Sequence, residues 1–184
     1  NYNLSLDESE DNGYQIMPNP GEAKPVEINA VVNDNDGTED INSVTALVTA
    51  PEFVKEIQLN KVINTSEGIL FSGNISMNYY DMSEKYNIIL TAKDSNNENS
   101  EKSIEFEYLS VVSFDIDTEQ LVFDNVKNKE TKEIVCDADF STKTTPTLKN
   151  LGNTKLEVGV YSTNLALDGN IMQYKFIGNY NNIT

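Results

Sequence analysis

Apolar side chains recur at every second position through much of the first 110 residues, and this alternation constrains the fold more than any other feature. In residues 69–79 one face carries apolar residues and the other carries Ser or Asn. The apolar face consists of Ile69, Phe71, Ile75, Met77 and Tyr79. Helical periodicity is nearly absent. A period of two is typical of β-strands that bury one face, so the pattern predicts an all-β fold.

The same alternation appears in several further segments, separated by clusters of Gly, Asn, Asp and Ser. The predicted inward rows are Val26, Ile28, Ala30 and Val32; Val44, Ala46 and Val48; Ile57 and Leu59; Tyr86, Ile88, Leu90 and Ala92; and Ile104, Phe106 and Tyr108. About six short strands with turn residues between them indicate an antiparallel β-sandwich.

The N-terminal segment has a pattern of its own. Tyr2, Leu4 and Leu6 alternate on one face, and residues 7–13 are an acidic stretch that reads as a linker. A lone strand is not stable in water, so it must pair with another strand. It can pair with the edge of the following domain, complete a preceding domain, or be donated to a neighbouring molecule.

Three motifs resemble known surface proteins. Residues 32–44 (VNDNDGTEDINSV) resemble the strand–turn–strand of Ig-like repeats in archaeal and bacterial surface proteins. Tyr86, in residues 81–94, stands where an Ig-like domain has its tyrosine corner. Residues 145–160 look like β-sandwich modules of methanogen-type envelope proteins. The resemblance implies tandem Ig-like sandwiches in an archaeal cell-surface protein, outside the cell.

The predicted domain organisation follows from these patterns. Residues 1–13 form the N-terminal strand and acidic linker, residues 14–110 an Ig-like sandwich, and residues 111–184 a second sandwich. Residues 109–116 contain no Gly or Pro, which predicts a stiff junction. The second part offers only about five strands, at 121–126, 134–140, 147–150, 156–160 and 172–176. A complete Ig-type sandwich has seven, so the second one is incomplete, and truncation of a longer chain explains this as well as an open sheet does.

Composition excludes several classes of function. The net charge is -17, which opposes binding to nucleic acid and to anionic membranes. The chain has no histidine, no arginine and one cysteine, and no carboxylate pair or phosphate loop stands out, so we expect no enzyme activity. No apolar stretch is long enough to span a bilayer.

Acidic loops are the best candidates for chemistry. Asp34, Asp36, Glu39 and Asp40 follow one predicted strand, and Asp94 and Asn96 follow another. In an Ig-like sandwich these two loops lie at the same end, where their oxygens would suit Ca²⁺. The spacing does not match an EF-hand, and the same Asn, Asp and Gly residues are also good turn formers. A bound calcium ion and plain turn chemistry both remain open.

Four N-x-[ST] sequons could carry glycans in an exported protein, at Asn3, Asn64, Asn74 and Asn182. A chain this rich in Asn, Ser and Thr contains about that many by chance. The alternation predicts that Asn74 points outward from its strand, and Asn64 is expected in a loop.

These observations favour a non-enzymatic, extracellular structural subunit of a surface layer, sheath or fibre. It would associate with itself or with other envelope proteins. One way to assemble is donation of the strand that carries Tyr2, Leu4 and Leu6. The alternatives are a module that binds a carbohydrate or protein through its loops, and a calcium-stabilised spacer of a larger surface protein.

Overall fold

The computed structural model describes residues 2–4, 13–34, 37, 40–118, 121–123, 125, 127, 129–135, 137–158, 166–167 and 170–171. Every regular element in these residues is a β-strand, so the prediction of an all-β chain is confirmed. None of the described segments forms a helix able to cross a membrane.

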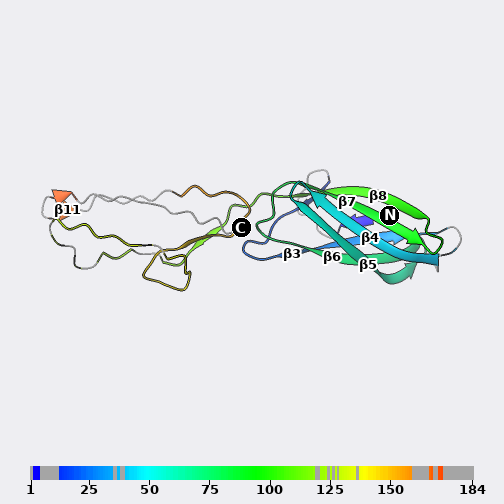
Figure 1. Cartoon of the computed structure of the whole chain (residues 1–184), viewed down its shortest axis with the longest axis horizontal. Helices are drawn as coiled ribbons and strands as arrows, with labels where there is room; N and C mark the ends of the chain where they lie inside the picture. The colour runs from blue at the N-terminus through cyan, green and yellow to red at the C-terminus, as the bar shows by residue number, and fades with distance from the viewer. Residues whose placement is uncertain are drawn as a thin grey trace.

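Eight strands form one curled sheet (Figure 1). They are β1 (Tyr2–Leu4), β2 (Tyr14–Ile16), β3 (Lys24–Val32), β4 (Ile41–Ala50), β5 (Phe53–Thr65), β6 (Gly68–Met77), β7 (Lys85–Asp94) and β8 (Asn99–Tyr108). Their order across the sheet is β1-β3-β6-β5-β4-β7-β8-β2. A layer of β8, β7, β4 and β5 opposite a layer of β6 and β3 is the arrangement of an Ig-like sandwich.

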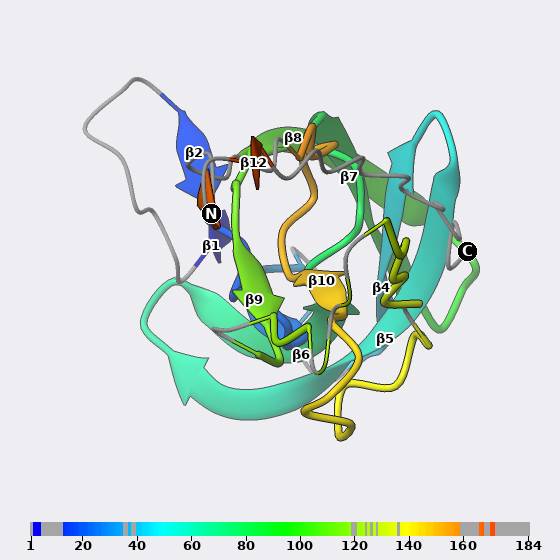
Figure 2. The same ribbon diagram turned by 90° about the vertical axis from the view of Figure 1, so that its left-hand side faces the viewer.

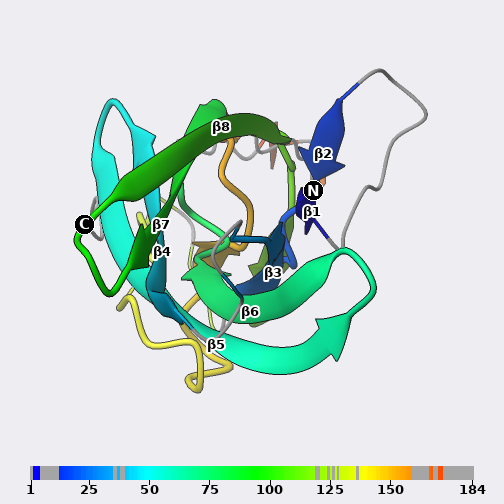
Figure 3. The ribbon, with the colours of Figure 1, turned by 90° about the vertical axis from the view of Figure 1, so that its right-hand side faces the viewer.

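The long strand β5 joins the two layers. Its residues 53–59 pair with β4, and its residues 60–65 pair with β6. The register with β6 shifts between Lys61 and Ile63. Such an irregularity bends a strand and increases its twist, which lets one strand turn the corner between two layers. Viewed along the long axis, the strands therefore surround a common interior (Figure 3).

That interior holds the apolar rows that the alternation predicts. The most deeply buried large side chains are those of Tyr86, Tyr108, Phe106, Ile28, Leu59, Ile69, Ile75, Met77 and Ile88. Tyr79, Val32, Ile57 and Ala92, which we assigned to the same rows, are only partly buried. The predicted core of the sandwich is thus confirmed, except that these four side chains are half-buried.

The N-terminal strand pairs within the same chain. In β1, Tyr2 lies opposite Ala30 and Leu4 opposite Ile28 of β3, in antiparallel register. This is the first of the three pairings open to it from sequence, at the edge of its own domain. Leu6 lies outside the described residues. The next strand, β2, runs parallel to β8 and buries Ile16 completely, a pairing that the sequence did not predict.

The second part of the chain extends away from one end of the sandwich (Figures 1 and 2). Its described strands form two ribbons. These are β9 (Phe114–Ile116) with β10 (Leu148–Asn150), and β11 (Ala166–Leu167) with β12 (Asn170–Ile171). Of the strands predicted here, the one at 147–150 is present, but the described parts of 121–126, 134–140 and 156–160 contain none. Val122 and Val135 are exposed in these segments.

Candidate functional site

Asn153 fastens the second part of the chain to the sandwich. Its side-chain Oδ1 accepts a hydrogen bond of 2.7 Å from the backbone N–H of Val111. Its Nδ2 donates to the backbone oxygens of Leu109, at 2.9 Å, and Asp81, at 3.1 Å. One amide thus satisfies three backbone groups, two in the connecting segment and one in the loop between β6 and β7. We call these contacts, with those of Leu151 and Gly152 below, the junction clamp.

Backbone contacts complete the junction clamp. The N–H of Gly21 donates to the oxygen of Leu151 at 2.8 Å, and the N–H of Leu151 donates to the oxygen of Ser113 at 2.9 Å. Gly152 is buried, and a Cβ atom placed on it would lie 2.1 Å from the oxygen of Val111. Only glycine permits this close approach of two backbones.

Gly152 and Asn153 lie in a bend of the chain, and these residue types are common in turns because they accept a positive φ. Neither has one. Gly152 is required because the chain of Val111 and Ser113 lies against it, and Asn153 because its side chain reaches across the junction. Both roles depend on contacts with residues that are distant in the sequence, so the sequence alone could not predict them.

Tyr86 forms the predicted tyrosine corner at the same end of the sandwich. Its hydroxyl donates to the backbone oxygen of Met82 at 2.9 Å, four residues upstream. Its ring stacks on Phe106 at 5.1 Å and meets Phe53 edge-on at 5.3 Å. Burial, together with the nearby carboxylates of Asp81 and Glu84, raises the pKa of the Tyr86 hydroxyl to about 12.

A groove opens beside this corner, between the β4–β5 turn and the loop from β6 to β7. Its volume is about 200 Å³, and we call it the junction groove. Its lining consists of Ala50, Pro51, Glu52, Phe53, Tyr80, Asp81, Met82, Glu84 and Tyr86. Tyr80 is 63% exposed and Met82 49% exposed, so apolar surface faces solvent here.

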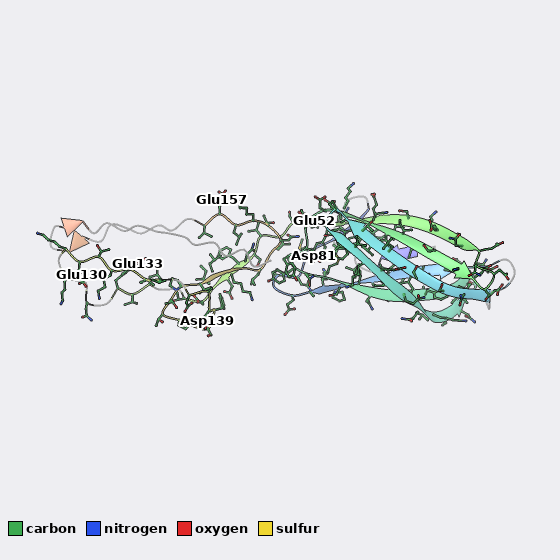
Figure 4. The ribbon with its side chains drawn as sticks, in the orientation of Figure 1. Glu52, Asp81, Glu130, Glu133, Asp139 and Glu157 are labelled. Atoms are coloured by element: carbon green, nitrogen blue, oxygen red, sulfur yellow. The ribbon has the colours of Figure 1, made fainter. Side chains whose placement is uncertain are left out.

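Carboxylates surround the apolar lining. Asp81 accepts hydrogen bonds from the backbone and side chain of Asn78, so its carboxylate is engaged in its own turn. Glu52 and Glu84 are exposed, and their carboxylates make no hydrogen bond or ion pair with any described residue; the backbone oxygen of Glu84 accepts the N–H of Tyr108 at 2.9 Å. No lysine lines the groove. Figure 4 shows Glu52 and Asp81 together at the end of the sandwich that meets the second part.

The two acidic loops predicted to meet do lie together, at the opposite end of the sandwich. The N–H of Ser95 donates to the oxygen of Asp40 at 2.9 Å, and the amide of Asn96 lies 3.5 Å from the Asp40 carboxylate. The Asp94 carboxylate accepts the N–H of Glu98 at 2.7 Å. These contacts are the turn chemistry that we weighed against calcium.

Of the remaining predicted ligands, the structure describes only Asp34. Asp34 is partly buried at the end of the preceding strand. Asp36 and Glu39 lie outside the described residues. Within the parts of the chain that the structure describes, no three acidic, histidine or cysteine side chains are grouped closely enough to hold a metal ion. Calcium binding stays a prediction.

The sequons fall in different settings. Asn74 is exposed on β6, as predicted. Asn64 is exposed too, but it belongs to β5 rather than to a loop, because β5 continues to Thr65. Asn3 lies in β1, and Asn182 is outside the described residues. Both exposed side chains are accessible to a glycan.

One further polar cluster, in residues 137–147, escaped the sequence reading. The hydroxyl of Thr145 donates to the Asp137 carboxylate, and this bond lowers the pKa of that carboxyl. The side chain and N–H of Ser141 do the same for Asp139. The carboxylates are exposed and serve as local turn acceptors, with an Asp-x-Asp-x-Ser pattern as the only signal in the sequence.

Comparisons with known proteins give little beyond the fold. No family model matches the chain, and no curated protein matches it. Among solved structures, the chain is similar to murine CRIg. The similarity covers 59% of this chain and 97% of that one, at 8% identity and a TM-score of 0.29.

Proposed function

We propose that this chain is a non-enzymatic structural module of an extracellular assembly, such as an archaeal surface layer, sheath or fibre. Its role is to hold two β-rich parts in one orientation. The observation that carries the proposal is the junction clamp, in which one partly buried bend ties the second part to Gly21, to the loop between β6 and β7, and to the connecting segment. A flexible linker would leave these backbone groups to water.

Several properties agree with such a role. The side chains that line the junction groove, and those that line a second hollow between β4, β5 and β6, include no nucleophile paired with a base. The acidic surface keeps a module soluble. We further propose that the second part belongs to another sandwich, which the β9–β10 ribbon would begin, in line with the tandem arrangement expected from sequence.

Strand donation is one way for such modules to assemble. β1 is only three residues long and covers β3 at residues 28–30, so it contributes few ladder bonds in its own chain. The same register could form with β3 of a neighbouring molecule. Deletion of residues 1–7 tests this: oligomers that form unchanged without the strand would exclude donation.

The direct test of the proposed function is electron microscopy of the native material, together with the purified chain. A structural subunit gives filaments or a lattice in which the module repeats. Native material that contains only dispersed monomers, at the concentration found on the cell, would reject the proposal.

A calcium-stabilised spacer is the second candidate, because the loops that end at Asp40 and follow Asp94 do meet. Calorimetry with and without calcium distinguishes it. A stabilising ion raises the melting temperature, and Asp40→Ala abolishes the rise. No shift with calcium, combined with no effect of Asp36→Ala, would exclude this candidate.

A further inference from the structure

The junction groove combines the two features that recognise a lysine side chain. Phe53 and Tyr80 offer aromatic surface, and ring faces attract an ammonium group. Glu52 and Glu84 offer carboxylates at the rim. A lysine stem of four methylenes packs on apolar surface while its charged end stays at the edge, which matches this order of groups.

The size of the groove agrees with one long side chain. Its 200 Å³ correspond to roughly six or seven water molecules at about 30 Å³ each, comparable with the five heavy atoms of a lysine side chain. Because the carboxylates of Glu52 and Glu84 have no partner among the described residues, a cation that enters does not have to displace one. The carboxylate of Asp81 accepts a hydrogen bond from Asn78. It therefore adds negative electrostatic potential to the groove but is less available to bind the ammonium group directly.

Charge along the chain identifies the occupant. Residues 1–110 carry 20 acidic residues and 6 lysines, whereas residues 111–184 carry 10 acidic residues and 7 lysines. The second part therefore holds 7 of the 13 lysines but only 10 of the 30 acidic residues, so it is less negative than the first. Its most lysine-rich stretch is at 127–132, where Lys127 and Lys129 are exposed on a turn closed by Glu130.

The position of this turn excludes binding within one molecule. Glu130 lies at the far end of the second part, and Glu52 and Asp81 lie at the sandwich (Figure 4). A turn at one end and a groove at the middle of an elongated molecule can meet only between two copies. Such a contact joins two different surfaces, so it leaves one free groove and one free turn and can propagate into a fibre.

We propose that the junction groove binds the lysine turn around Lys127 and Lys129 of a second copy of this chain. The inference rests on the proposed structural function and names the contact by which the subunits associate. Lysine stems lie on Phe53 and Tyr80, and the ammonium groups reach Glu52 and Glu84. Along the resulting fibre, each molecule is offset from the next by the distance between the groove and the turn of one molecule.

Sedimentation velocity of the whole 184-residue chain tests the contact with two charge reversals. The groove variant is Glu52→Lys with Glu84→Lys, and the turn variant is Lys127→Glu with Lys129→Glu. Each alone should weaken association by more than about tenfold, because like charges then face each other. An equimolar mixture should restore it, because each variant supplies the complement of the other.

Controls separate this inference from the proposed function. Glu101→Lys with Glu105→Lys makes the same change of charge on exposed positions of β8 and should leave association unchanged. Oligomers that survive both reversals overturn the groove contact but leave a structural assembly through another surface. Loss in each variant without rescue in the mixture also overturns it. Unmodified chain that remains monomeric at every concentration refutes the assembly itself.

Discussion

Removal of the Asn153 amide should release the second part of the chain from the sandwich. Asn153→Ala deletes the three hydrogen bonds to Val111, Leu109 and Asp81. At about 1 kcal/mol net for each, the loss is about 3 kcal/mol. That corresponds to a shift of about a hundredfold toward the undocked state. The sandwich core is not touched, so its unfolding should change little.

Native-state amide exchange measures this shift residue by residue. The Val111 N–H is bonded to the Asn153 side chain, and the Gly21 and Leu151 N–H groups to other parts of the clamp. In Asn153→Ala these amides should exchange about a hundredfold faster, whereas amides in β7 should not change. Asn87→Ala, which removes a surface hydrogen bond with Ser103, serves as the control. Unchanged protection of Val111, Gly21 and Leu151 would refute the clamp.

Three further predictions concern single positions. Gly152→Ala should undock the second part more completely than Asn153→Ala, because its Cβ would lie 2.1 Å from the Val111 oxygen; wild-type exchange rates at Leu151 would contradict this. Gly68→Ala should lower the free energy of unfolding, measured by urea denaturation, by about 3 kcal/mol. Gly68 has φ 140°, and an added Cβ would lie 2.3 Å from the Val32 oxygen. A loss below about 1 kcal/mol would contradict this prediction. Tyr86→Phe should cost about 1 kcal/mol at pH 7 through the lost bond to Met82, and should remove an alkaline destabilisation. Because the folded pKa of Tyr86 is about 12 and the unfolded value is 10, the native protein keeps a proton that the unfolded chain loses. The free energy of unfolding of the wild type therefore falls between pH 10 and 12, by up to about 1.4 kcal/mol per pH unit. Equal dependence on pH in the wild type and in Tyr86→Phe would disprove the assignment.

Local alternation was enough to predict the core of the sandwich. Rows such as Ile69, Phe71, Ile75 and Met77 are buried as expected, because a strand with one apolar face has only one way to place it. The tyrosine corner at Tyr86 was also predictable, since its motif is confined to a few neighbouring residues.

Features that depend on distant contacts were not predictable. The three residues of β2 are too few to show a period, and their parallel pairing with β8 spans about ninety residues of sequence. The corner in β5 arises from a register shift against β6 that no composition signal marks. The described residues of the segments 121–126 and 134–140, which are rich in apolar side chains, form no strand, so apolar content within a segment did not suffice to predict one.

The candidate site divides in the same way. The meeting of the Asp40 and Asp94 loops followed from the expected topology and is confirmed. The junction groove and the clamp were missed, because Phe53, Tyr80 and Glu84 come from separate turns, and Asn153 contacts residues more than forty positions away. A Gly-Asn pair is common in turns, so its presence in the sequence does not indicate contacts with distant residues.

The central claim is that the two parts of the chain form one stiff unit, and a distance distribution between two spin labels tests it most directly. Labels at Glu101→Cys in β8 and Lys149→Cys in β10, in a Cys136→Ser background, span the junction. The clamp predicts a single narrow distribution in the wild-type background and a broad one in Asn153→Ala. A broad distribution in both would contradict a stiff module.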